Sequence, residues 1–214
     1  MKKISLKNLL LYSFLFFLVV FLILFLTFPK FLVFDKLLLK NGIYLTAQKV
    51  DETPISIRLK GVEMYNQNSR LSRFDFLKVG LGVFRIRLEG YCGKANLVLE
   101  ISPWGMVLRA KDFTCLEGME GLSTELYIKE GIYGNLNIKG IKVQGIKLDE
   151  ISFDFKGRVF TAKGKMGGIN LIGDGQIVYN SKNPLRSAIN GQVSGGGIRL
   201  IIGSTLERIE IKTQ

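Results

Sequence analysis

The apolar residues of the chain fall into two different patterns, and the first is a continuous run. Leu9 to Phe28 is a 20-residue stretch without charge, in which only Ser13 and Thr27 fall outside the apolar set. A helix of that length spans about 30 Å, which matches the hydrocarbon core of a bilayer. The run therefore predicts a single transmembrane helix, with Leu9, Leu18 and Phe28 in the membrane anchor.

The flanks of this run predict its orientation. Lys2, Lys3 and Lys7 precede it, and positively charged flanks stay in the cytoplasm. A cleaved signal peptide is the alternative, but its apolar region has about 7 to 15 residues and ends in an A-x-A-like site. This run is longer and is followed by Pro29 and Lys30. We therefore expect residues 1–29 to be a cytoplasmic tip and an uncleaved signal anchor, with the remainder outside the cytoplasm.

A short membrane-proximal helix is expected over residues 30–42. Pro29 precedes this segment and Gly42 closes it, as is typical of a helix start and a helix end. Its apolar residues either lie against the outer face of the membrane or dock on the following domain. The pattern alone does not decide between these two positions.

The second pattern begins at Ile43 and has period two, which indicates half-buried antiparallel strands. Short alternating runs, separated by glycines, repeat about a dozen times. Residues 116–123 interrupt them, and a helical turn is expected there. The pattern predicts an all-β domain over residues 43–214, built as a curved antiparallel sheet that is either a sandwich or an open-groove half-barrel. Trp104, in a Ser-Pro-Trp-Gly turn, is expected to cap the core.

Composition narrows the chemistry. The chain has no histidine, which excludes His-based triads, His general bases and His metal ligands. No nucleophile–base pair is evident, so we expect no enzyme, no cofactor and no metal. The chain has 30 Lys+Arg against 18 Asp+Glu, with a net charge of +12. Outward cations on the strands, such as Arg58, Arg85 and Arg87, attract anionic headgroups, meet an acidic partner domain, or block edge-to-edge aggregation. Nucleic acid is not expected outside the cytoplasm.

The two cysteines, Cys92 and Cys115, emerge at the same end of a predicted meander. They belong to strands that are not neighbours, so about 9 to 10 Å would separate them at the sheet spacing, beyond the Cα limit near 7 Å for a disulfide. An oxidising compartment nevertheless favours pairing of an even number of cysteines. A disulfide requires the loop ends to converge, and the sequence leaves it open.

The arrangement of anchor, short helix and β-domain resembles the type II secretion system protein N (GspN) family. The resemblance rests on the helix that ends at Phe28-Pro29, the strands within residues 42–62, the turn over residues 88–93 and the glycine-punctuated strands of residues 131–138 and 157–175. It implies a non-enzymatic, single-pass inner-membrane subunit with a periplasmic domain that contacts other secretion-system subunits.

A second interpretation comes from a different class of protein. Lipopolysaccharide-transport protein C and AsmA-like proteins are similar in their single N-terminal span and exported β-domain, and the resemblance to them implies lipid as a partner. Six apolar residues on the inner face decide between the two, because they line an open groove in a lipid carrier and pack into a closed core in a scaffold. They are Ile86, Leu88, Ile138, Phe153, Phe155 and Phe160.

Overall fold

The structure is a computed structural model that describes residues 6–40, 42–66, 69–143, 146–180, 186–205 and 208–213. It begins with two helices, α1 (Leu6–Thr27) and α2 (Lys30–Lys40). Phe28 and Pro29 separate them, since the residue before a proline is disfavoured in the helical conformation. The expected short helix over residues 30–42 is therefore present and ends at Lys40.

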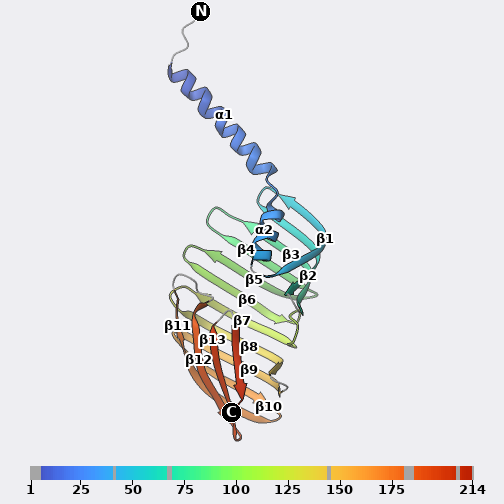
Figure 1. Ribbon diagram of the computed structural model, residues 1–214, viewed down its shortest axis with the longest axis vertical. Coiled ribbons are helices and arrows are strands. Elements are labelled where there is room, and N and C mark those ends of the chain that lie inside the picture. The colour runs from blue at the N-terminus through green and yellow to red at the C-terminus, as the bar shows by residue number, and fades with distance from the viewer. Residues whose placement is uncertain are drawn as a thin grey trace, which may run out of the picture.

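Helix α1 extends away from the rest of the chain (Figure 1). Nearly all of its described large apolar side chains are exposed, including Phe14, Phe17 and Leu18. Side chains in α1 are described for residues 12–24 and 26–27, and the described helices contain no stretch that is long and apolar enough to cross a membrane. Leu9 lies in α1, but its side chain is outside the described residues.

The remaining described chain is all-β, as the period-two pattern predicts. Fourteen strands of the described residues form one antiparallel sheet in strict sequence order. The strands are β1 (Tyr44–Thr53), β2 (Ser56–Asn66), β3 (Ser69–Leu81), β4 (Ile86–Cys92), β5 (Ala95–Ser102), β6 (Gly105–Phe113), β7 (Gly121–Ile128), β8 (Ile132–Val143), β9 (Ile146–Gly157), β10 (Val159–Met166), β11 (Ile169–Val178), β12 (Ala188–Gly195), β13 (Ile198–Thr205) and β14 (Arg208–Thr213).

Register places most of the buried apolar residues of the strands on one face, which we name the inner face. Residues paired directly across neighbouring strands share a face, so single rows can be followed across the sheet. One inner row runs Ile57, Val79, Leu88, Leu99, Leu108, Leu126, Gly134, Phe155, Phe160, Gly175, Gly191 and Ile202. The neighbouring outer row is mostly polar and begins Asp51, Arg58, Lys78 and Glu89. The sheet therefore has one apolar face and one charged face.

The C-terminal half of the sheet curls over its own inner face. Figure 1 shows β11–β13 in front of β8–β10, and side chains from β7 to β13 join in one buried cluster. Phe153, Phe155 and Phe160 lie at its centre, with ring centroids 5.7 to 6.0 Å apart. Gly175 and Gly191 lie under Phe160, and a Cβ at either position would collide with its ring. These three phenylalanines therefore belong to a closed hydrophobic core in the C-terminal half of the sheet.

A second buried cluster lies at the N-terminal end of the sheet, where Ile57, Leu59 and Val62 of β2 are buried. Helix α2 packs Phe31 and Phe34 against this cluster. The N–H groups of Lys30 and Phe31 donate to the carboxylate of Glu52 on β1, at 3.0 and 3.3 Å. Negative charge is favourable at a helix N-terminus, so Glu52 fixes the start of α2 against β1. One side of α2 is thus docked on the domain.

Candidate functional site

Between the two buried clusters, the inner face is only half covered. The inner-face residues of β4–β6 nearest the β3–β4 and β5–β6 turns define a region that we name the central strip: Ile86, Leu88, Leu99, Ile101, Met106 and Leu108. Leu88 and Leu99 are half-buried, whereas Ile86 and Ile101 are 42% and 38% exposed. By contrast, Val79 on β3 and Leu126 on β7, which flank the strip within the same inner row, are buried. Leu88 packs against the N-terminal cluster and Leu108 against the C-terminal one, so the uncovered apolar surface of the strip is centred on Ile86 and Ile101.

The six inner-face residues singled out in the sequence divide between the two environments. Ile86 and Leu88 lie in the central strip, whereas Phe153, Phe155 and Phe160 are in the closed C-terminal core. Ile138 is half-buried and packs against both clusters. The sequence treats these six as one set, but curling of the sheet covers only the C-terminal strands.

Four further members of the strip, Leu99, Ile101, Met106 and Leu108, were not singled out as a site. Their signal is the alternation along residues 97–101 and 106–110, which identifies strands. These four residues can be grouped with Ile86 and Leu88 only when the register between strands is known. The register shows that Ile86 pairs with Ile101 and that Ile101 pairs with Met106.

An exposed apolar rim continues the strip at the strand ends. Val83 and Phe84 in the β3–β4 turn are 89% and 65% exposed, and Trp104 in the β5–β6 turn is 64% exposed. The Phe84 and Trp104 rings meet edge-to-face with centroids 6.2 Å apart. The expectation that Trp104 caps the core is wrong, because its turn projects past the last inner-face pair. The rim instead extends the apolar surface outward.

The structure joins Cys92 and Cys115 by a disulfide with a Cα–Cα distance of 6.3 Å. The separation expected from strand spacing does not apply, because Cys115 lies beyond the end of β6. A bulge between Ala110 and Phe113 places Asp112 at φ 45° and turns the chain back. Residues 114–120 then reach β3, which lies beyond β5 and β4 in the sheet. This return brings Cys115 close to Cys92 at the end of β4.

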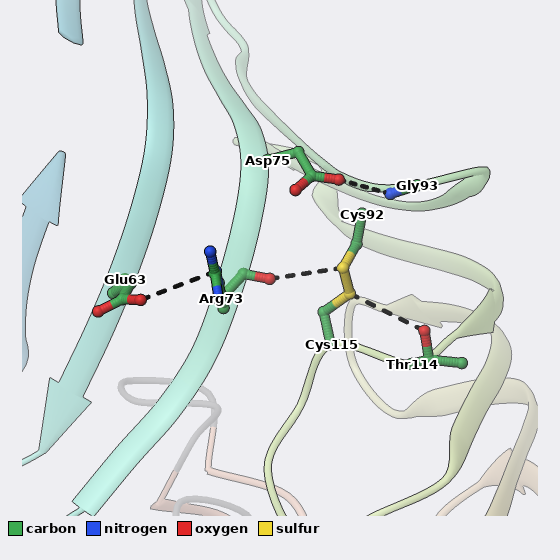
Figure 2. The surroundings of a disulfide bond; sticks show 7 residues. All are labelled: Glu63, Arg73, Asp75, Cys92, Gly93, Thr114 and Cys115. Carbon is green, nitrogen blue, oxygen red and sulfur yellow. Dashed lines mark hydrogen bonds and ion pairs between the residues drawn. A yellow bond between two sulfur atoms is a disulfide. The ribbon is translucent and has the colours of Figure 1, made fainter. Parts of the chain in front are cut away.

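This returning segment pairs with the free edge of β3 and is not a helical turn, which corrects the expectation for residues 116–123. Arg73 N–H donates to the Cys115 carbonyl at 3.2 Å, and Glu117 N–H donates to the Leu71 carbonyl at 3.0 Å. Figure 2 shows Cys92, at the end of β4, bonded to Cys115 beside Arg73. The segment thereby covers backbone groups that β4 is too short to reach.

Charged side chains hold the same segment. Arg70 Nε donates to Glu117 Oε1 at 2.7 Å, and a second nitrogen of Arg70 lies 2.6 Å from that oxygen. The hydrogen bond to the Glu117 carboxylate and its negative charge raise the pKa of the Arg70 guanidinium above its ordinary value. Asp75 Oδ2 accepts a hydrogen bond from Gly93 N–H at 2.7 Å and fixes the neighbouring turn (Figure 2). The disulfide therefore lies in an ordered structural junction.

Replacing Cys115 with serine is expected to destabilise the protein by about 2 to 4 kcal/mol, because the bond closes a loop of 23 residues in the unfolded chain. Urea unfolding of the full chain in detergent measures the change. Wild type in reductant should show the same loss, whereas Cys92→Ser/Cys115→Ser should lose no more than the single variant. Equal midpoints for oxidised and reduced wild type would contradict a structural disulfide.

The described side chains form no metal-binding cluster. In the part of the chain with assigned positions, no three His, Cys, Asp or Glu side chains gather to hold a metal ion. The six residues of the central strip are all apolar, and the charged residues that alternate with them, such as Arg87 and Glu100, lie on the outer side. What this arrangement offers chemically is apolar surface.

One relative of this chain has been found among curated proteins. An uncharacterized protein of Aquifex aeolicus (strain VF5) is 37% identical over 186 residues, which cover 86% of this chain and 85% of the relative. No protein-family profile matches the chain, and no solved structure matches it. The description of the relative names no activity or ligand, so the function rests on the geometry.

Proposed function

The chain belongs to the same family as the Aquifex aeolicus protein, and we propose that it is a membrane-anchored, non-catalytic protein that binds a lipid acyl chain on the inner face of its sheet. The central strip is the observation that carries this proposal. Soluble domains seldom leave a large contiguous apolar surface exposed unless a ligand, a partner or a membrane covers it. An acyl chain matches a strip that is apolar along its whole length.

The energetics favour a chain-like apolar ligand. Each methylene group buried contributes about 0.8 kcal/mol, so five or six buried methylenes stabilise the complex by about 4 to 5 kcal/mol before the ordering cost. The strip is as wide as three strands, roughly 10 to 15 Å at the sheet spacing. The exposed rim of Val83, Phe84 and Trp104 adjoins it at the strand ends and extends the apolar surface that a ligand could contact.

Three observations support anchoring of the domain at a membrane by α1. Nearly all of the described apolar side chains of α1 are exposed. Helix α2 exposes Leu32, Val33 and Leu37 on the side away from the sheet, although Phe31 and Phe34 dock on it. The Cys92–Cys115 disulfide favours an oxidising compartment outside the cytoplasm. In this proposal the β-domain lies outside the cytoplasm, so a reporter fused after Gln214 is active only there.

A role as a GspN-like subunit of type II secretion stays a prediction. A scaffold needs no uncovered interior, whereas a lipid-binding protein does, and the half-exposed Ile86 and Ile101 therefore favour lipid. The two functions differ in what touches the strip. A protein partner covers it in the first case, and an acyl chain covers it in the second.

Site-specific photocrosslinking in cells tests the proposal. A photoreactive amino acid is placed at Ile101 in the strip and, as a matched control, at Ile172 on the outer face of β11. We expect a lipid adduct at position 101 and none at position 172, detected by mass spectrometry of the purified full chain. No adduct at position 101 would contradict lipid binding. A protein adduct there would contradict it as well and would favour the secretion subunit.

A further inference from the structure

A basic pocket lies on the outer face, beside the apolar rim. It has a volume of about 460 Å³ and is formed by the ends of β1–β4 and the turns between them. Four cations line it, with the hydroxyl-bearing Thr53 and Ser56 at its edge. The cations are Arg58, Lys78, Arg85 and Arg87.

The acidic groups nearby do not balance these cations. Glu89 and Glu100 are the carboxylates within 4.0 Å of Lys78, Arg85 and Arg87. Arg58 makes no ion pair with any described residue, because Asp51, its cross-strand neighbour, pairs with Lys49 at 3.0 Å. Arg58 also lies directly opposite Lys78, and like charges in that position repel each other. The pocket therefore has an excess of two positive charges that a bound anion would neutralise.

The tip of the β3–β4 turn projects beside this pocket. Gly82 N–H donates to the Arg85 carbonyl at 2.7 Å and closes the turn, so that Val83 and Phe84 form its exposed tip. Leu81 N–H donates to the carbonyl of Ile55, a second exposed apolar residue, in the β1–β2 turn. An apolar tip with cations directly behind it is the arrangement that binds a bilayer interface.

The position of the pocket along the chain agrees with a membrane surface. Its β1–β2 turn directly follows Glu52, which accepts hydrogen bonds from Lys30 and Phe31 at the start of α2. Only Phe28 and Pro29 lie between that start and the end of α1. The basic pocket and the apolar tip thus belong to the end of the sheet where α1 enters it (Figure 1).

We propose that this end of the sheet docks on the surface of an anionic bilayer. The pocket binds the phosphate of an anionic phospholipid through Arg58, Lys78, Arg85 and Arg87, and Val83 and Phe84 insert among the headgroups. The proposal rests on anchoring by α1, but it does not depend on an acyl chain in the central strip. It assigns the outer face a lipid contact separate from the inner one, and it gives the rim a fixed orientation at the membrane.

Trp104 is the single tryptophan of the chain, and its contact with Phe84 makes it a local probe. The full chain is reconstituted into vesicles of brominated phosphatidylcholine, with or without about a third of phosphatidylglycerol, and quenching of Trp104 is measured. We expect quenching at least twofold stronger in the anionic vesicles, and weaker in high salt because screening reduces the attraction. Equal quenching in both vesicles, or none in either, would overturn the proposal.

Charge variants locate the effect. Arg58→Gln/Arg85→Gln should reduce quenching to the phosphatidylcholine level, whereas Lys163→Gln/Lys165→Gln, which removes two exposed cations on β10, should leave it unchanged. If the two variants behave alike, the pocket is not the site. Ile101→Glu, which disrupts the central strip, should retain the dependence on anionic lipid, so that failure of acyl-chain binding and failure of headgroup binding are seen separately.

Discussion

Replacing Phe153 with glutamate is expected to unfold the sheet. Phe153 is 9% exposed and contacts both Phe155 and Phe160 in the C-terminal core. A carboxylate there has no cation within the apolar cluster to pair with, and burying an unpaired charge costs several kcal/mol. We expect a loss above about 5 kcal/mol, which is comparable to the whole stability of a domain. Circular dichroism and proteolysis of the full chain in detergent measure the loss.

The matched control is Ile172→Glu. Ile172 is 66% exposed on the outer face of β11, so the same substitution places the carboxylate in water and should change stability by no more than about 0.5 kcal/mol. A Phe153→Glu protein that melts like wild type would show that the curled half of the sheet is not a packed core.

Replacing Ile101 with glutamate is expected to remove bound lipid while leaving the domain folded. Ile101 is 38% exposed, so its carboxylate can stay hydrated in the free protein, but it must lose water or its charge when an acyl chain covers the strip. A penalty of about 1.4 kcal/mol weakens binding tenfold, and we expect a loss of at least that size. Lipid extracted per mole of purified full chain measures it.

Ile172→Glu is again the control and should retain the lipid content of wild type. Melting curves of the Ile101→Glu protein are recorded alongside, and a midpoint within a few degrees of wild type is expected. Lipid content equal to wild type in a folded Ile101→Glu protein would show that lipid does not occupy the strip.

The local features of the fold follow from the sequence because they depend on neighbouring residues. Pro29 separates two helical segments, and alternation such as Phe153, Ser152 and Ile151 assigns residues to strands and to faces of strands. The same alternation places Ile86 and Phe153 on one inner face, as the register of β4 and β9 bears out. For these elements, period and turn chemistry are sufficient.

The open or closed state of that inner face depends on contacts between distant strands. Phe160 is buried because Gly175 and Gly191 let β11 and β12 approach its ring, whereas Ile101 is 38% exposed. Alternation is identical in the two halves, so it cannot distinguish a strip from a core. The C-terminal half is closed because the sheet curls over its own inner face there.

The Cys92–Cys115 disulfide shows the same dependence on long-range geometry. Strand spacing alone separates the two cysteines too far, and only the bulge near Asp112 sends residues 114–120 back to β3. The free edge of β3 that receives this segment exists because β4 pairs with residues 76–81 only. Relative strand lengths after folding, which the sequence pattern does not give, therefore determine the pairing.

Native mass spectrometry of the wild-type full chain, released from detergent, tests lipid binding most directly. We expect a species heavier than the polypeptide by the mass of one lipid, which survives the collisional energy that strips detergent and is absent from the Ile101→Glu protein. A wild-type chain that carries no lipid under these conditions, or that carries a protein subunit over the strip, would contradict the account.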